Sequence, residues 1–99
     1  MAVVMARVAV KAECVGELEG AREKVFAALE RECPVGVRYT SYRLADGVTY
    51  IALLEIEDGV ENPLPAIAEF GEFQAGLKDW VDGSAPVVEQ LEVRGSYSG

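Results

Sequence analysis

Apolar residues alternate with mixed positions over residues 3–11, and a period of two predicts a β-strand. The even positions share one face, which we expect to be buried under helices: Val4, Ala6, Val8 and Val10. The odd positions combine apolar and charged side chains: Met5, Ala9, Arg7 and Lys11. The strand is therefore expected to have one buried apolar face and one face that combines apolar and charged side chains.

Residues 17–33 change to a helical period. Their apolar positions form a single stripe: Leu18, Ala21, Val25, Ala28 and Leu29. The charged positions are expected to lie mostly away from it: Glu19, Arg22, Glu23 and Glu30. Pro34 should end this helix, because a proline disfavours the α conformation in the residue before it.

Two β-rich runs follow, at residues 35–44 and 48–57, with Ala45-Asp46-Gly47 between them. Asp-Gly between such runs is a strong hairpin signal. A two-residue loop places Arg43 on the same side as Tyr50, whereas a three-residue loop places Tyr42 there. The sequence leaves both registers open. The inner face of the second run is clear in either case: Val48, Tyr50, Ala52, Leu54 and Ile56.

A second helix is predicted over residues 63–81. Asn62 is a favourable N-cap and Pro63 suits the first helical position. Gly71 and Gly76 weaken the helix and are candidate break points. Its apolar side is formed by Ile67, Phe70, Leu77, Trp80 and Val81. After a turn, residues 87–97 are predicted to form the last strand, with Leu91 and Val93 on one face.

The element order is strand, helix, hairpin, helix, strand. We therefore expect a single domain over residues 1–99 with the ferredoxin-like β-α-β-β-α-β plan. This α+β fold has a four-stranded antiparallel sheet with both helices on one face.

Helices on one face leave the other face of the sheet open. That face should carry Met5, Ala9, Ile51 and Leu53. Together these side chains form an apolar surface that is too large to remain exposed to water. Packing two such sheets face to face would bury them, so we expect a homodimer. The alternative is a monomer with a mixed outer face, since charged residues also lie there: Arg7, Lys11, Glu55 and Glu57.

Charge excludes several partners. The chain has 17 acidic and 9 basic residues, for a formal net charge of −8. Nucleic-acid binding depends on Lys and Arg neutralising phosphates, and no basic run exists for an anionic membrane, so we expect neither partner. No apolar run approaches the roughly 20 residues of a membrane helix, and no basic segment precedes the apolar start. The expected location is the cytoplasm.

The residue types available limit the chemistry. The chain has no His, so Ser-His and Cys-His pairs are excluded and metal ligation is weak. The acidic residues Glu55, Glu57, Asp58 and Glu61 match no calcium loop and suit a solvated segment. Cys14 and Cys33 stand at opposite ends of the first helix, about 25 Å apart, too far for a disulfide. No bound cofactor or metal is expected.

The hairpin resembles a known group. Gly36-Val37-Arg38-Tyr39, Tyr42-Arg43 and the run from Tyr50 to Glu55 are similar to the hairpin of the dimeric α/β-barrel superfamily. More narrowly, they resemble the antibiotic-biosynthesis monooxygenase-type family, in which a strand with a Gly and a following Tyr precedes a strand ending in Glu. Residues 68–73 fall where that family has its second helix.

The resemblance implies a dimeric barrel and, in some relatives, oxidation of polycyclic phenols by oxygen without a cofactor. Those relatives use a small set of Asn, Trp and Tyr or Arg residues in a cleft. This chain departs from the family in lacking the His usual in the second helix, so the haem-degrading branch does not fit. Asn62 is better explained as a helix cap, and no catalytic role is carried over to it.

Aromatic and polar residues are expected to converge between the helices and the sheet. The candidates for substrate binding are Tyr39, Tyr42, Arg43 and Tyr50 from the hairpin, with Phe70, Phe73 and Trp80 from the second helix. Apolar pockets with a few converging polar groups are typical of small-molecule sites. The alternative is that these aromatics are simply core residues.

Two functions remain open. The first is a small-molecule-binding dimeric barrel with cofactor-independent monooxygenase-like activity on a flat apolar or phenolic substrate. It requires a cavity of a few hundred cubic ångströms between the second helix and the sheet. The second is a non-catalytic dimeric ligand-binding or regulatory module. The catalytic residues and the ligand's identity do not follow from the sequence.

Overall fold

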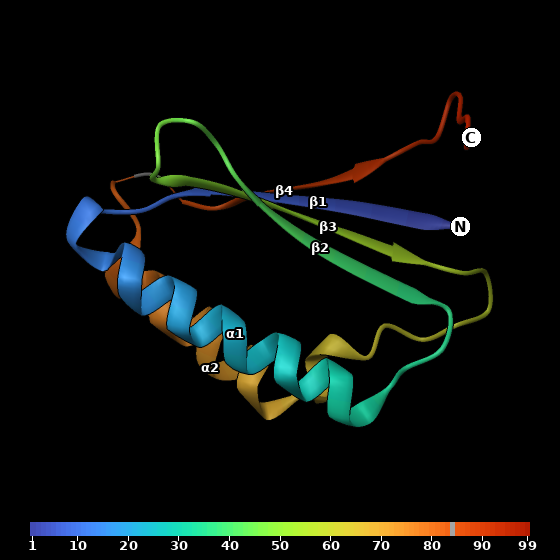
Figure 1. Ribbon diagram of the computed structural model, residues 1–99, viewed down its shortest axis with the longest axis horizontal. Coiled ribbons are helices and arrows are strands. Elements are labelled where there is room, and N and C mark those ends of the chain that lie inside the picture. Colours follow the sequence, from blue (N-terminus) through green and yellow to red (C-terminus); the bar gives the residue numbers. More distant parts are fainter. Residues whose placement is uncertain (84) are drawn as a thin grey trace.

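The computed structural model describes residues 1–83 and 85–99. Four strands form one antiparallel sheet in the order β2-β3-β1-β4. Both long helices lie side by side against the same face of this sheet (Figure 1). The predicted α+β class and ferredoxin-like topology are therefore confirmed.

β1 (Ala2–Ala9) occupies an interior position of the sheet, between β3 and β4. It is shorter than predicted, and Val10 beyond it forms only an isolated bridge with Val81. The even residues of β1 face the helices, as the alternation predicted. The short 3₁₀ helix η1 (Ala12–Cys14) then leads into the first long helix.

α1 (Val15–Glu32) begins two residues earlier than predicted. Leu18, Val25 and Ala28 are its buried residues, and all three belong to the predicted stripe. The helix ends at Cys33, which adopts a left-handed conformation with φ 48° and donates its N–H to Leu29 O at 2.8 Å. Cys14 and Cys33 are both free thiols.

The hairpin of β2 (Val37–Arg43) and β3 (Thr49–Ile56) resolves the register. Arg43 is paired with Tyr50, so these two side chains share a face and Tyr42 takes the other. Leu44 N donates to Thr49 O at 2.8 Å, which leaves residues 45–48 as the loop. Four loop residues have the same parity as two. The loop therefore has neither predicted length, yet orients Arg43 as the two-residue alternative does.

The Asp46 carboxylate holds this loop. Its Oδ1 accepts hydrogen bonds from Val48 N and Thr49 N, both at 2.9 Å, and its Oδ2 accepts one from Thr49 Oγ1 at 2.6 Å. Gly47 adopts φ 78°, a left-handed conformation that glycine allows at little cost. Both residues of the Asp-Gly pair therefore stabilise the loop, Asp46 by accepting hydrogen bonds and Gly47 by adopting a positive φ.

The predicted second helix is split. A 3₁₀ turn, η2 (Leu64–Ala66), is followed by α2 (Ala68–Trp80), with Ile67 in an extended conformation between them. Asn62 Oδ1 accepts from Leu64 N at 3.0 Å, so it caps the short turn and not α2. The break lies at Ile67, whose φ of −93° and ψ of 117° are extended, and Pro65 lies within the preceding 3₁₀ turn. Gly71 and Gly76 both lie within α2 without interrupting it.

β4 (Val87–Leu91) is much shorter than predicted. Among the described residues it pairs with β1 alone, and its last residue, Leu91, is opposite Val3. β1 has a single residue left beyond that point, so residues 92–97 have almost no strand to pair with. All five residues of β4 are exposed, and the strand forms an edge of the sheet (Figure 1).

The core consists of two clusters at opposite ends of the helix–sheet interface. One contains Val25, Ala28, Leu54, Ile56, Leu64 and Ile67, and the other contains Val10, Leu18 and Tyr50. Phe73 of α2 packs against both. The interface between the clusters is where the candidate site lies. Among the described residues, none of the helices is long and apolar enough to cross a membrane.

Candidate functional site

A row of small side chains crosses the centre of the sheet on its helix-facing side. Ala6 of β1 is paired with Ala52 of β3, and Ala52 is paired with Ser41 of β2. The neighbouring rows are much larger: Val8, Tyr50 and Arg43 on one side, Val4, Leu54 and Tyr39 on the other. The small side chains of this row therefore leave space between the sheet and the helices.

A cavity of about 560 Å³ occupies this space. Ala6, Ser41 and Ala52 form its floor. Its walls come from α1 and α2, through Leu18 and Val25 and through Phe70, Phe73 and Leu77. Ligand cavities typically measure about 300–1,000 Å³ and have mostly apolar linings, and this cavity meets both conditions.

The exposed lining residues gather at one end, between α2 and the edge strand. Gln74 and Lys78 of α2 are exposed there, as are Ala85, Pro86 and Val88 on the chain leading into β4. Val88 faces the helices yet is 65% exposed. We therefore place the mouth of the cavity between α2 and β4. The opposite end, at α1 and β2, is formed by the half-buried Arg22, Tyr39 and Ser41.

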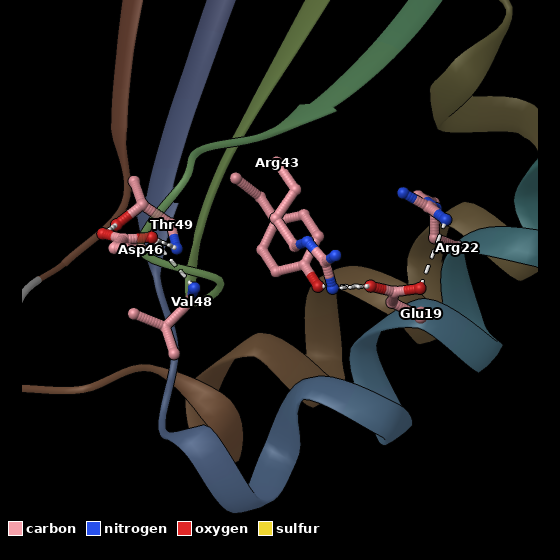
Figure 2. A network of polar contacts seen from close by, with 7 residues as sticks. Glu19, Arg22, Arg43, Asp46, Val48 and Thr49 are labelled. Atoms are coloured by element: carbon pink, nitrogen blue, oxygen red, sulfur yellow. Dashed lines mark hydrogen bonds and ion pairs between the residues drawn. The ribbon is translucent and has the colours of Figure 1, made fainter.

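Tyr50 contributes a buried ring to the lining. Its hydroxyl donates a 2.6 Å hydrogen bond to Glu19 Oε2 on α1. Arg43 Nη1 donates to the same oxygen at 3.3 Å, and Arg22 Nη2 lies 3.6 Å from Oε1. Figure 2 shows the two guanidinium groups on either side of the Glu19 carboxylate. Glu19 thus joins α1 to the hairpin.

These contacts move two pKa values in opposite directions. The hydrogen bond from Tyr50 lowers the pKa of Glu19, and the nearby cations Arg22 and Arg43 lower it further. Burial raises the pKa of Tyr50, and so does its bond to an ionised carboxylate. At neutral pH Glu19 is therefore ionised and Tyr50 neutral, with its proton directed at Glu19.

Tyr39 sits at the inner end of the cavity. Its ring stacks on Phe26 of α1, with centroids 5.4 Å apart and an interplanar angle of 29°. Burial raises the pKa of the Tyr39 hydroxyl, although Arg22 partly offsets this. Within residues 1–83 and 85–99, neither the Tyr39 hydroxyl nor Ser41 Oγ makes a hydrogen bond. Both hydroxyls remain able to bind a ligand.

The structure places the seven predicted site residues in three groups. Tyr39, Tyr50, Phe70 and Phe73 line the cavity. Arg43 and Trp80 lie next to it: Arg43 through Glu19, and Trp80 edge-on against Phe73 with ring centroids 6.1 Å apart. Tyr42 is on the opposite face of the sheet, paired with Ile51, and is 50% exposed.

Five polar residues that belong to this region were not among the predicted site residues: Glu19, Arg22, Ser41, Gln74 and Lys78. The helical pattern predicts that Glu19 and Arg22 lie mostly away from the apolar stripe of α1, whereas both side chains flank the stripe and are half-buried. Phe26 continues their i, i+3, i+7 line, which was an available sign that this side of α1 is partly covered. Gln74 and Lys78 are one turn apart on α2. Gln74 lies three positions before Leu77, and Lys78 lies one position after it.

A second, more open hollow of about 500 Å³ lies outside the inner end of the cavity. Arg22, Tyr39 and Ser41 border both spaces. The rest of this hollow is formed mainly by α1, through Glu23, Phe26, Ala27 and Glu30. These shared side chains therefore form the wall between the two spaces. Among the described residues, no three Asp, Glu or Cys side chains gather in a metal-binding arrangement.

No family model and no curated protein matches this sequence. Solved structures do match its fold. Rv0793 from Mycobacterium tuberculosis superposes with a TM-score of 0.76 at 16% identity, covering 98% of each chain. A structure described as an antibiotic biosynthesis monooxygenase gives 0.74 at 12% identity, covering 96% of this chain and 100% of its own. SnoaB, described as a cofactor-independent oxygenase from Streptomyces nogalater, gives 0.70 at 17%, covering 96% and 94%.

These similarities define the class of fold. The chain is a ferredoxin-like α+β protein whose fold is that of the antibiotic biosynthesis monooxygenase-type proteins. The resemblance seen in the hairpin is thereby confirmed at the level of the fold, over nearly the whole chain. Activity, substrate and assembly need separate arguments, because one fold serves many functions.

Proposed function

We propose that this protein binds a flat, largely apolar small molecule carrying a hydroxyl group, such as a polycyclic phenol. The observation that carries the proposal is the cavity above Ala6, Ala52 and Ser41, which lies between the two clusters of core residues at the helix–sheet interface. Leaving such a volume empty costs packing contacts, and a ligand would restore them.

The walls favour a flat molecule. Two rings of α2, Phe70 and Phe73, lie across from the shallow floor of the sheet. Aromatic side chains favour stacked or edge-to-face contacts with other rings. At the inner end, the hydroxyls of Tyr39 and Ser41 offer a donor and acceptor to a phenol, which would otherwise lose its hydrogen bonds to water.

Calorimetry with 2-naphthol, with naphthalene as the comparison compound, tests binding. Ala52→Leu would fill the floor of the cavity and is expected to abolish heat of binding and ligand-induced thermal stabilisation. Ala75→Leu introduces the same group at an exposed position of α2 outside the lining and should bind normally. Equal binding by the two variants would place the ligand elsewhere and contradict the proposal.

The catalytic form of the proposal is oxygenation of the bound phenol without a cofactor. It is supported by the shared fold with SnoaB, described as such an oxygenase. The test is oxidation of 1,8-dihydroxyanthrone, whose methylene carbon would become a ketone while one atom of O₂ leaves as water. Oxygen uptake by the metal-free protein should exceed autoxidation and the rate of Ala52→Leu. Binding without turnover would instead establish the non-catalytic ligand-binding alternative, which the absence of His favours.

The proposal includes a homodimer formed by the sheet face opposite the helices. The register puts Met5 beside Leu53 and Arg7 beside Ile51 on that face, and Val87 and Leu91 of the edge strand are 48% and 40% exposed there. Burying this surface against a second copy would remove it from water.

Sedimentation tests the assembly. The chain has a mass of 10.7 kDa, and the wild-type particle should have twice that mass. Leu53→Arg, at the centre of the outer face, should give the single-chain mass, whereas Ala75→Arg on α2 should not. A wild-type particle of single-chain mass at all concentrations would contradict the dimer.

A further inference from the structure

The charged side chains around the cavity are unlike those of the chain as a whole. The sequence has 17 acidic and 9 basic residues. Yet among the described residues that line the cavity, the charged ones are Arg7, Arg22 and Lys78, and none is acidic. Arg7 belongs by register to the outer face of the sheet, which leaves one cation at each end of the cavity.

The two cations differ in what already neutralises them. Arg22 lies 3.6 Å from the Glu19 carboxylate, which is ionised. Lys78 makes no ion pair within the part of the chain that the structure describes. The unneutralised charge of the cavity is therefore at its mouth, on α2.

Gln74 precedes Lys78 by one turn, so both side chains lie on the same side of α2 and both line the mouth. An ammonium group and a side-chain amide together can donate several hydrogen bonds to one anion. Both residues are exposed, so an anion held there would keep part of its hydration.

We propose that the ligand is an aromatic carboxylate and that Lys78, assisted by Gln74, binds its carboxylate at the mouth of the cavity. This inference rests on the proposed function and gives the ligand an orientation. The ring system lies over Ala6 and Ala52, and its hydroxyl points inward to Tyr39 and Ser41. The charged end stays near water while the apolar part is buried, which avoids the cost of fully desolvating an ion.

The probe is 6-hydroxy-2-naphthoate, which has a carboxylate and a hydroxyl at opposite ends of a flat ring system. Its neutral counterpart is 6-hydroxy-2-naphthamide. In low salt the wild-type protein should bind the carboxylate about three- to tenfold more tightly, the range expected of a partly exposed charged hydrogen bond. This preference should shrink at 0.5 M NaCl, because salt screens exposed charges.

Lys78→Met should remove the preference and leave the Kd for the amide within about twofold, and Lys78→Arg should keep the preference. Lys24→Met is the matched control, since Lys24 is an exposed lysine of α1 outside the cavity lining. Because the amide Kd is measured on every variant, a folding defect is separated from loss of the charge contact.

Two results would overturn the inference while leaving the proposed function intact. One is equal binding of carboxylate and amide by the wild-type protein. The other is a preference that survives Lys78→Met and disappears in Arg22→Met, which would place the carboxylate at the inner end. If neither naphthoate, naphthamide nor 2-naphthol binds, the proposed function itself fails and the inference fails with it.

Discussion

The Tyr50 hydroxyl and the Glu19 carboxylate, 31 positions apart in the sequence, are joined by a 2.6 Å hydrogen bond across the helix–sheet interface. Tyr50 is almost fully buried, whereas the Glu19 side chain is 31% exposed. A short bond from a neutral donor to an ionised acceptor is stronger than one between neutral groups. The Tyr50–Glu19 bond lies at the end of the cavity floor that is nearest to the hairpin loop.

Tyr50→Phe removes this bond while keeping the ring. We expect the Tm to fall by a few degrees, because Glu19 loses its strongest donor and keeps only Arg22 and the exposed Arg43. The pKa of Glu19 should rise toward its ordinary value, because Tyr50 is the main cause of its lowering. Thermal unfolding and a ¹³C NMR titration of the Glu19 carboxyl measure the two effects.

Tyr42→Phe is the matched control for that prediction. It removes the same atom from the same hairpin, but from a side chain that is exposed on the opposite face of the sheet. It should leave both the Tm and the Glu19 pKa unchanged. A Tm loss of the same size in both variants would show that the hydroxyl of Tyr50 has no special role.

The two glycines of α2 should respond in opposite ways to alanine. Gly71 has open space around the position of a Cβ, so Gly71→Ala should stabilise the protein by about 0.5–1 kcal/mol through helix propensity. A Cβ on Gly76 would clash with the Trp80 indole, so Gly76→Ala should destabilise it by about 1–3 kcal/mol despite the better propensity. Urea unfolding of the two variants measures both. Stabilisation by Gly76→Ala would mean that the indole moves aside freely.

Cys33→Gly should stabilise the protein by about 1 kcal/mol. Cys33 terminates α1 with φ 48°, a left-handed conformation that costs a residue with a Cβ about 1–2 kcal/mol and glycine almost nothing. Part of the gain is lost to the greater freedom of glycine in the unfolded chain. The measurement is the free energy of unfolding in urea, with Cys33→Ala as the comparison. Equal stabilities of the glycine and alanine variants would contradict the strain argument.

Stability should fall in acid, and the Asp46 loop should contribute to the fall. Bonds from Thr49 Oγ1 and from the Val48 and Thr49 N–H groups lower the pKa of Asp46, in that order of importance. Below the unfolded value of about 4, the unfolded chain takes up a proton that the folded chain still excludes, so the free energy of unfolding decreases as pH falls. The contribution is complete above that value and is lost as pH falls through the folded pKa.

Thermal unfolding between pH 7 and pH 3 measures this dependence. Asp46→Asn should have a lower Tm at neutral pH and a shallower decline in acid, since it cannot titrate. Glu19, Asp58 and Glu69 also have lowered pKa values, so some decline will remain in the variant. An unchanged acid slope in Asp46→Asn would contradict the role assigned to the loop.

Local patterns in the sequence determined the element order and the fold class. The period of two over residues 3–11 and the stripe from Leu18 to Leu29 identify which faces are buried, because burial repeats with the geometry of each element. Asp46-Gly47 marks the hairpin for an equally local reason. Tyr50 and Phe70 could be named as lining candidates because they lie on predicted inward faces. The inward side of Tyr39 depended on the hairpin register, which only the strand pairing decided, and Phe73 lay outside the predicted apolar side of the second helix.

Only the tertiary structure decided where the cavity is and which polar groups reach it. Ala6, Ser41 and Ala52 come from three strands, and nothing in their separate segments shows that pairing brings them into one shallow row. The face of the sheet on which Tyr42 lies depended on whether the hairpin loop has an even or an odd number of residues. The hydrogen bond from Leu44 N to Thr49 O decides this, because it leaves four residues in the loop. Glu19 and Lys78 look like solvent-facing charges within their own helices. Their roles arise from packing across the sheet, and such contacts between distant segments leave no periodic trace along the chain.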